Sequence, residues 1–255
     1  MHLVVLGVHY SIFRIPDFET IVLSRCRGFR GAYPFSMSST NMGTFSDQTE
    51  YWDRCAREKE FTHPFDFERF SRIVHSRARI LDYGCGYGRI CHQLREAGYR
   101  KVIGVDPALS MIREGKRRFP GLDLRHVKSH DFPFPAASFD AVLLFAVLNC
   151  IPSDEEQQIL METVHRMLCR GGILYLSDYF LQTDQRNRER YAKFEPEFGT
   201  YGVFELPDGA VLRHHARSWI EQLLSTFHTI SLEEMLAPTM HGHESVIFQY
   251  FGKTT

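Results

Sequence analysis

The chain has 255 residues, of which 44% are hydrophobic and 24% are charged, enough to bury a sizeable core in one large domain or in a domain with an appendage. The formal net charge of -1 at pH 7 excludes a global field that would draw the protein to nucleic acid or to an anionic membrane, although a local basic patch stays open. No run of about 18 apolar residues predicts a membrane span, and the N-terminus lacks the basic region and cleavage site of a signal peptide. The six cysteines form no C-x-x-C pair, which favours reduced thiols and a cytoplasmic protein.

Residues 1–44 show no clear periodicity and end in the polar run SMSSTNMG. Three interpretations of this segment stay open: an accessory strand or loop, a poorly ordered tail, or sequence upstream of a true start at Met37 or Met42. We expect an N-terminal extension over residues 1–44 and a folded domain over residues 45–255.

From Ser46 onward the hydrophobic pattern becomes regular. Helices are predicted over residues 46–61 and 66–74, and strands then alternate with helices. The predicted strands begin at residues 80, 101, 122, 139 and 173, and a helix over 216–227 precedes two more strands, over 228–235 and 245–251. Such alternation implies a mostly parallel α/β sheet covered by helices on both faces, with ligands bound at the carboxyl ends of the strands.

Three glycines at every second position follow the first core strand, in RILDYGCGYGR. Glycine there allows positive φ angles and lets a ligand approach the main chain; a tight turn without a ligand is the alternative. The dinucleotide fingerprint G-x-G-x-x-G would need a third glycine at position 89, which is Arg89, so a dehydrogenase is disfavoured.

With its preceding aspartate, this stretch resembles the first motif of the class I S-adenosylmethionine (SAM) dependent methyltransferases. The residues that match this motif are Asp82, Gly84, Gly86 and Gly88. The resemblance extends in the family's order over about 100 residues, from Arg79 to Asp178. It implies a Rossmann-like sheet of seven strands, the last of them antiparallel.

The resemblance also implies further cofactor contacts. Asp106, followed by Pro107, stands where the family's acidic residue binds the ribose hydroxyls, and a carboxylate can accept two hydrogen bonds from a diol. A helix cap is the other interpretation of Asp106. Met111 matches the position that packs on adenine, although Ala108 replaces the usual serine.

Two later segments complete this comparison. Asp131 would accept the adenine amino group and the Phe132 backbone would meet the ring, with an Asp turn before Pro133 as the alternative. Phe145, in the fourth predicted strand, is a further candidate for cofactor contact, and Asn149 stands where many relatives carry a histidine. In the first helix, Tyr51 or Trp52 could close over the methionyl end of SAM or simply pack inward.

Residues 180 to about 215 are too long for a simple connection and are expected to form a lid insertion with a hairpin that turns at Asp208 and Gly209. The lid could place aromatic or imidazole groups over the methyl group; the catalytic candidates are Tyr179, His214 and His215, with Tyr191 and Tyr201 as further possibilities. The alternative is that His215 merely begins the next helix. A metal site from His214, His215, His241 and His243 lacks a recognised spacing, so we expect no metal.

The predicted function is transfer of a methyl group from SAM to an O, N or S nucleophile of a small molecule, with S-adenosylhomocysteine (SAH) as product. Methyl transfer from a sulfonium mainly requires alignment of the nucleophile and exclusion of water. The alternatives are an RNA or protein methyltransferase, which would need a recognition domain or a basic surface, and a noncatalytic SAM-binding protein. We expect a monomer or homodimer with no nucleic-acid or membrane partner.

Overall fold

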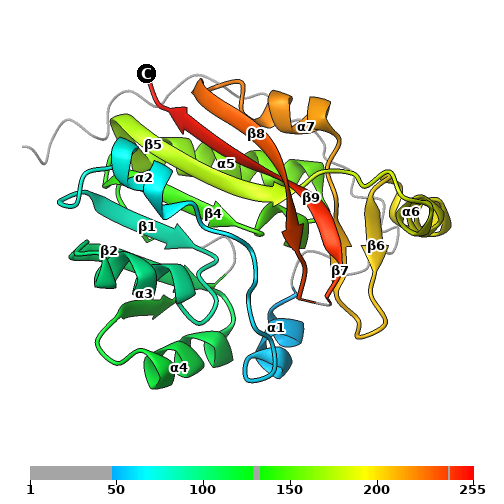
Figure 1. Ribbon diagram of the computed structural model, residues 1–255, viewed down its shortest axis with the longest axis horizontal. Helices are drawn as coiled ribbons and strands as arrows, with labels where there is room; N and C mark the ends of the chain where they lie inside the picture. Colours follow the sequence, from blue (N-terminus) through cyan, green and yellow to red (C-terminus); the bar gives the residue numbers. More distant parts are fainter. Residues whose placement is uncertain (1–47, 129–132, 241) are drawn as a thin grey trace, which may run out of the picture. The chain divides into compact units, whose positions relative to one another are not determined.

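The computed structural model describes residues 48–128, 133–240 and 242–255. The elements alternate as the sequence predicts in the first part of the sheet (Figure 1). Their bounds, in chain order, are α1 (Thr49–Cys55), α2 (Phe67–Ile73), β1 (Arg79–Tyr83), α3 (Arg89–Glu96), β2 (Lys101–Asp106), α4 (Leu109–Arg118), β3 (Asp123–His126), β4 (Phe139–Phe145), the short 3-10 helix η1 (Leu148–Cys150), α5 (Asp154–Met167), β5 (Leu168–Tyr179), α6 (Gln185–Phe198), β6 (Val203–Glu205), β7 (Val211–Arg213), α7 (Arg217–Leu223), β8 (His228–Pro238) and β9 (Glu244–Lys253).

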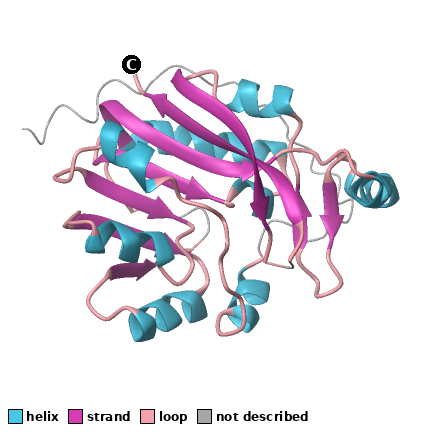
Figure 2. Ribbon diagram, viewed as in Figure 1, coloured by secondary structure: helices cyan, strands magenta, loops and turns pink. Residues whose placement is uncertain are grey.

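The central sheet has seven strands in the order β3-β2-β1-β4-β5-β9-β8. Neighbouring strands from β3 to β5 pair in parallel, whereas β9 pairs antiparallel with both β5 and β8. The expected α/β class, strand number and antiparallel last strand are therefore confirmed. Helices and strands form the layers shown in Figure 2.

Strand β4 lies in the middle of this sheet and feeds two hydrophobic cores. Val142 and Leu144 pack on one face with side chains of α5 and α7, such as Val164. Leu143 packs on the other face with side chains of α2 and α3, such as Phe70. Alternate residues of a strand point to opposite faces, so a strand covered on both sides must be apolar throughout, as FDAVLLF nearly is.

The first helix is shorter than its pattern predicts. It ends at Cys55, whose carbonyl accepts the N–H groups of both Glu58 and Lys59 in a closing turn. The chain then runs without helix or strand to residue 66. Pro64 cannot donate a helical hydrogen bond, and Phe61 instead packs beside Gly86, so contacts with the glycine loop determine the path of this segment.

The segment between β5 and α7 contains α6 and a two-stranded hairpin of β6 and β7. The hairpin turns at Asp208 and Gly209, as expected, with Gly209 at φ +89°. The expectation for residues 1–44 lies outside the described residues, as do those for Asp131 and Phe132. No helix in the described ranges is both long enough and apolar enough to cross a membrane.

Candidate active site

The glycine loop connects β1 to α3, and its shape depends on glycine. Gly84, Gly86 and Gly88 all have positive φ, and Gly88 is the left-handed N-cap residue of α3. A β-carbon on Gly86 would overlap the Phe61 ring, with Phe61 Cζ only 2.8 Å away. Residues other than glycine would neither adopt these φ angles readily nor leave room for Phe61 beside the loop.

Asp106 ends β2 and ties this loop to the next strand. Its carboxylate accepts the N–H of Gly86 and the N–H of Ala108, both at 2.8 Å. Burial raises the pKa of Asp106 to about 6, and the two N–H donors oppose that rise. The capping interpretation of Asp106 is wrong, because the N-cap residue of α4 is Ala108 and the N–H of Ser110 in its first turn donates to Asp53. Asp106 instead lines the cavity described below.

Asp82 lies deeper, at the end of β1. It is 2% exposed and accepts a hydrogen bond of 3.2 Å from the Cys91 thiol. Burial raises its pKa to about 6, so two carboxyl groups with elevated pKa values lie beside one loop.

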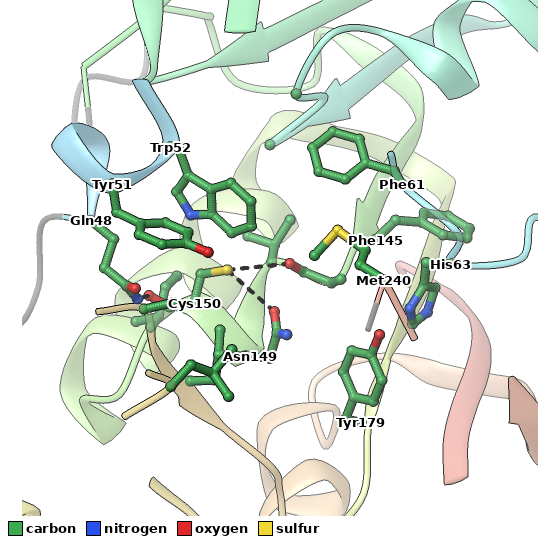
Figure 3. Close-up of a pocket in the computed structure, with 18 of the residues that line it drawn as sticks. Gln48, Tyr51, Trp52, Phe61, His63, Phe145, Asn149, Cys150, Tyr179 and Met240 are labelled. Atoms are coloured by element: carbon green, nitrogen blue, oxygen red, sulfur yellow. Dashed lines mark hydrogen bonds between the residues drawn. The ribbon is translucent and has the colours of Figure 1, made fainter. Parts of the chain in front are cut away.

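A cavity of about 1300 Å³ opens at the carboxyl ends of β1, β2, β4 and β5 (Figure 3). The predicted site residues that line it are Tyr51, Asp82, Gly84, Gly86, Asp106, Pro107, Met111, Phe145, Tyr179 and His214. Gly88 and His215 do not line it, and Asp131 and Phe132 lie outside the described residues. The structure thus brings most of the predicted site together from segments more than a hundred residues apart in the chain.

Helix α1 covers one side of the cavity with two aromatic side chains. Tyr51 donates a hydrogen bond of 2.9 Å to Asp208 in the hairpin, which also forms an ion pair with Lys59. Trp52 faces the cavity near Phe61, with 6.1 Å between the ring centroids. Both aromatic candidates of this helix therefore reach the cavity, and α1 is joined to the β6–β7 hairpin.

The two lid histidines lie in different surroundings. His214 lines the cavity, but its Nδ1 lies 2.5 Å from the Tyr191 hydroxyl, whose oxygen also accepts the N–H of Gln182. That hydroxyl hydrogen is then directed to Nδ1, which leaves the ring's own hydrogen on Nε2. Burial holds the pKa of His214 well below its usual range, and its Nδ1 already has Tyr191 as a hydrogen-bond partner.

His215 is fully buried away from the cavity. Its Nδ1 lies 3.1 Å from the carbonyl of Tyr179, and its Nε2 lies 3.0 Å from Gln157. These contacts join α5, β5 and the lid, so they suit a structural role. Adjacent residues thus point in different directions here, as the alternative interpretation of the pair anticipates.

Two further cavity residues, His63 and Arg89, were not among the predicted site residues. Arg89, at the start of α3, donates to the backbone carbonyl of His63, while its Nε has no hydrogen-bond partner in the described part of the chain. His63 is 6% exposed and meets the cavity beside Phe145 and Tyr179 (Figure 3). For His63 the sequence offers only a His-Pro step between two predicted helices.

Comparisons with known proteins all indicate similarity to methyltransferases. Residues 81–176 match a family model described as a methyltransferase domain. The chain is 23% identical over 151 residues to an uncharacterized methyltransferase of Oceanobacillus iheyensis, covering 57% of this chain and 70% of that protein. It is 28% identical over 134 residues to the human eEF1A lysine and N-terminal methyltransferase, covering 48% of this chain but only 19% of that protein.

The fold is similar to that in a crystal structure of a SAM-dependent methyltransferase from Methanosarcina mazei. The TM-score is 0.69 at 24% identity, over 74% of this chain and 97% of that one. The chain is therefore similar to the class I SAM-dependent methyltransferases, in the sequence of residues 81–176 and in its fold. SAM is the cofactor of this methyltransferase, and when bound it supplies a methyl group on a positively charged sulfur.

The cavity of the methyltransferase fits this cofactor. Asp106 and the glycine loop offer an acceptor and close backbone approach, and Met111 gives an apolar wall. The unpartnered Nε of Arg89 is suited to a carboxylate such as that of the methionyl group, because a buried donor without a partner is unfavourable.

Within the described ranges, no group of three or more His, Cys, Asp or Glu side chains is placed to hold a metal ion. The alternative histidine cluster depends partly on His241, which lies outside those ranges.

Proposed function

We propose that this methyltransferase transfers the SAM methyl group to an oxygen, nitrogen or sulfur atom of a small molecule. The observation that carries the proposal is the large cavity at the carboxyl ends of the strands. Its volume of about 1300 Å³ exceeds the roughly 300 to 1000 Å³ of a pocket for one drug-sized ligand. Cofactor and a small acceptor would therefore fit together in one cavity.

The lid side of this cavity has the mixed lining expected for an acceptor. Apolar rings such as Phe194 and Phe204 lie there beside Arg186, Arg190 and Lys193, which follow one another at helical spacing on α6. Glu189 of α6 and the hairpin residues Glu205 and Asp208 line the same side, so positive and negative side chains are balanced there. We favour an aromatic or otherwise apolar acceptor that carries a polar group.

Within this proposal the cofactor residues have separate roles. Asp106 accepts hydrogen bonds from the ribose hydroxyls, Met111 packs on the adenine, and Arg89 binds the methionyl carboxylate. Tyr51 and Trp52 close the cavity from α1. The protein is proposed to act in the cytoplasm, in agreement with the free state of the cysteines in the described residues.

Protein or RNA acceptors form the second candidate class. The similarity to the human eEF1A methyltransferase supports it, but that match covers only 19% of the human protein and leaves its substrate recognition uncompared. A cavity with room for the cofactor and a small acceptor favours the small molecule, since a folded protein or RNA would have to insert one side chain or base.

The test is methyl transfer from radiolabelled SAM to three acceptor preparations offered in parallel. These are a panel of low-molecular-weight phenols, thiols and amines that includes aromatic acids, a total protein preparation, and total RNA. We expect label in the low-molecular-weight panel alone. Label in protein or RNA with none in the panel would refute the small-molecule proposal while leaving the methyltransferase itself intact.

A further inference from the structure

His63 is a buried histidine with one nitrogen that has no partner among the described residues. It lies in the extended segment between α1 and α2, where Arg89 holds its backbone carbonyl. Its ring meets Phe145 and Tyr179 edge to face, at centroid distances of 6.0 and 5.2 Å. Its Nδ1 is buried without a hydrogen bond in the described ranges, and the residue lines the cavity.

The other ring nitrogen fixes the position of the hydrogen. His63 Nε2 lies 2.7 Å from Ser177 Oγ, and that hydroxyl donates its own hydrogen to the carbonyl of Phe248 at 2.8 Å. Ser177 has one hydroxyl hydrogen, so towards His63 it can only accept. The neutral ring therefore carries its hydrogen on Nε2, and Nδ1 presents a bare lone pair.

The surroundings keep this ring neutral. Burial first, and the nearby Arg89 guanidinium second, lower the pKa of His63 to about 3. The charged and titratable groups that face it are Arg89 from α3 and the Tyr179 phenol from β5. A lone pair that is neither protonated nor bonded is unusual in a protein interior and is suited to a bound X–H group.

We propose that His63 Nδ1 accepts the hydrogen of the acceptor's attacking O–H, S–H or N–H group and thereby aligns that atom for methyl transfer. The inference rests on the proposed function and narrows its substrate class. Acceptors whose attacking atom carries no hydrogen, such as thioethers and tertiary amines, would leave Nδ1 unpartnered and are excluded as good substrates.

The step balances without another reactant. The acceptor's attacking atom gives its lone pair to the methyl carbon, the electron pair of the broken S–C bond stays on sulfur, and the acceptor's hydrogen leaves as a proton to Nδ1. One positive charge is lost from sulfur as one appears on the imidazole, so the net charge of the buried cavity is unchanged. This conservation allows a base of low pKa to act here, because no additional charge has to be buried. The proton then passes to solvent when the products leave.

The first test observes His63 directly and does not depend on turnover. The full chain labelled with ¹⁵N-histidine is studied by NMR at neutral pH with SAH, and the His63 signals are assigned by their loss in His63→Gln. We expect a protonated Nε2 and an unprotonated Nδ1, and added phenol at saturating concentration should shift the Nδ1 signal. A protonated Nδ1, or a signal that saturating phenol leaves unmoved, would overturn the proposal.

Ser177→Ala tests the reason for the tautomer. It removes the group that accepts from Nε2 but keeps the imidazole, so a mixture of the two tautomers is expected. Retention of a pure Nε2–H form in this variant would show that something other than Ser177 sets the tautomer.

The second test separates this role from cofactor binding. Gln at position 63 can place its amide near Ser177, while it lacks the Nδ1 acceptor. We expect His63→Gln to bind SAH within about 3-fold of wild type and to lose roughly 100-fold in kcat on the panel compound that is methylated best. His165→Gln, which changes a histidine outside the cavity lining, is the matched control and should leave kcat unchanged.

The outcomes distinguish the two proposals. If wild type does not bind SAH, or labels only protein or RNA, the proposed function fails. If it methylates thioanisole or pyridine as well as 4-hydroxybenzoate and thiophenol, the role of His63 fails while the small-molecule function stands. Equal loss of SAH binding and kcat in His63→Gln would also overturn the role, because it would place His63 at the cofactor.

Discussion

At the scale of single residues, Asp106 has the clearest pH signature. Hydrogen bonds from ribose hydroxyls favour the ionised carboxylate, whose pKa in the free protein is raised to about 6. SAM and SAH affinity should therefore fall as the pH drops through about 6. In the free protein the sign for folding is opposite: the folded state holds this proton more tightly than the unfolded chain, so this group's contribution to the free energy of unfolding decreases as the pH rises from about 4 to about 6.

Calorimetry with SAH at about pH 7.5 and about pH 5.5 measures the binding effect. Asp106→Asn should bind SAH roughly 10-fold more weakly than wild type at the higher pH, and its dissociation constant should change less between the two pH values. Asp82 titrates in wild type and in Asp106→Asn alike, so its contribution to the pH dependence is the same in both. An unchanged dissociation constant in Asp106→Asn would rule out the ribose assignment.

Arg89 supports a second prediction at this scale, because its proposed partner is only one part of the ligand. Arg89→Gln should weaken SAH binding by about 10-fold, through loss of a charge-assisted hydrogen bond. 5′-Methylthioadenosine has no methionyl carboxylate, so its affinity should stay within about 2-fold of wild type. If both ligands lose affinity equally, Arg89 acts by holding the His63 segment and not by binding the carboxylate.

At the scale of elements, the loop between β1 and α3 and the segment that crosses it depend on each other. Phe61 stacks on Tyr87, with ring centroids 4.7 Å apart, and its N–H donates to the Tyr87 hydroxyl at 3.1 Å. The ring therefore cannot move freely when Gly86 gains a β-carbon. Gly86→Ala should lower the free energy of unfolding by more than about 2 kcal/mol and abolish SAH binding.

Gly98→Ala is the matched control for that substitution. Gly98 also has positive φ, at +93°, but no atom lies within 4 Å of its added β-carbon. Gly98→Ala should lower the free energy of unfolding only through backbone strain, by about 1 kcal/mol, and should bind SAH normally. If chemical denaturation shows that Gly86→Ala and Gly98→Ala lower the free energy of unfolding equally, crowding by Phe61 contributes nothing to the effect of Gly86→Ala.

The same elements show where sequence reasoning succeeds. The strand β4 and the glycine loop were predictable because their signals are local: an apolar run for a strand buried on both faces, and glycines for positive φ. Asp106 and Met111 follow at fixed distances from such strands, so their place at the cavity could also be predicted. The end of α1 could not, since contacts of Phe61 and His63 with a distant loop override the helical pattern.

The roles of the histidines were beyond the sequence for a related reason. His63, His214 and His215 differ in which ring nitrogen is already bonded, and those partners come from β5, α6 and α5. A pattern of residue types contains no information about such nitrogen-specific contacts. The unpartnered Nδ1 of His63 is therefore visible only in the three-dimensional structure.

At the scale of the whole molecule, the cavity is lined from Gln48 in the N-terminal part of the described chain to Ser245 at the start of β9. A ligand held there contacts elements that are joined through the seven-stranded sheet, so binding should stabilise the entire folded unit and not one loop. Because Arg89 stands in place of a third fingerprint glycine, we expect NAD to be a poor ligand.

Thermal unfolding should report this coupling. SAH at about 100 times its dissociation constant stabilises the folded state by roughly 2.7 kcal/mol, which in a chain of this size corresponds to a rise in Tm of roughly 5 to 10 °C. SAM should act similarly and NAD should not, and the rise should be smaller in Asp106→Asn at the same ligand concentration because fewer sites are occupied. A single transition that moves as a whole is expected; a second transition that SAH leaves in place would show that part of the sheet unfolds independently of the cavity.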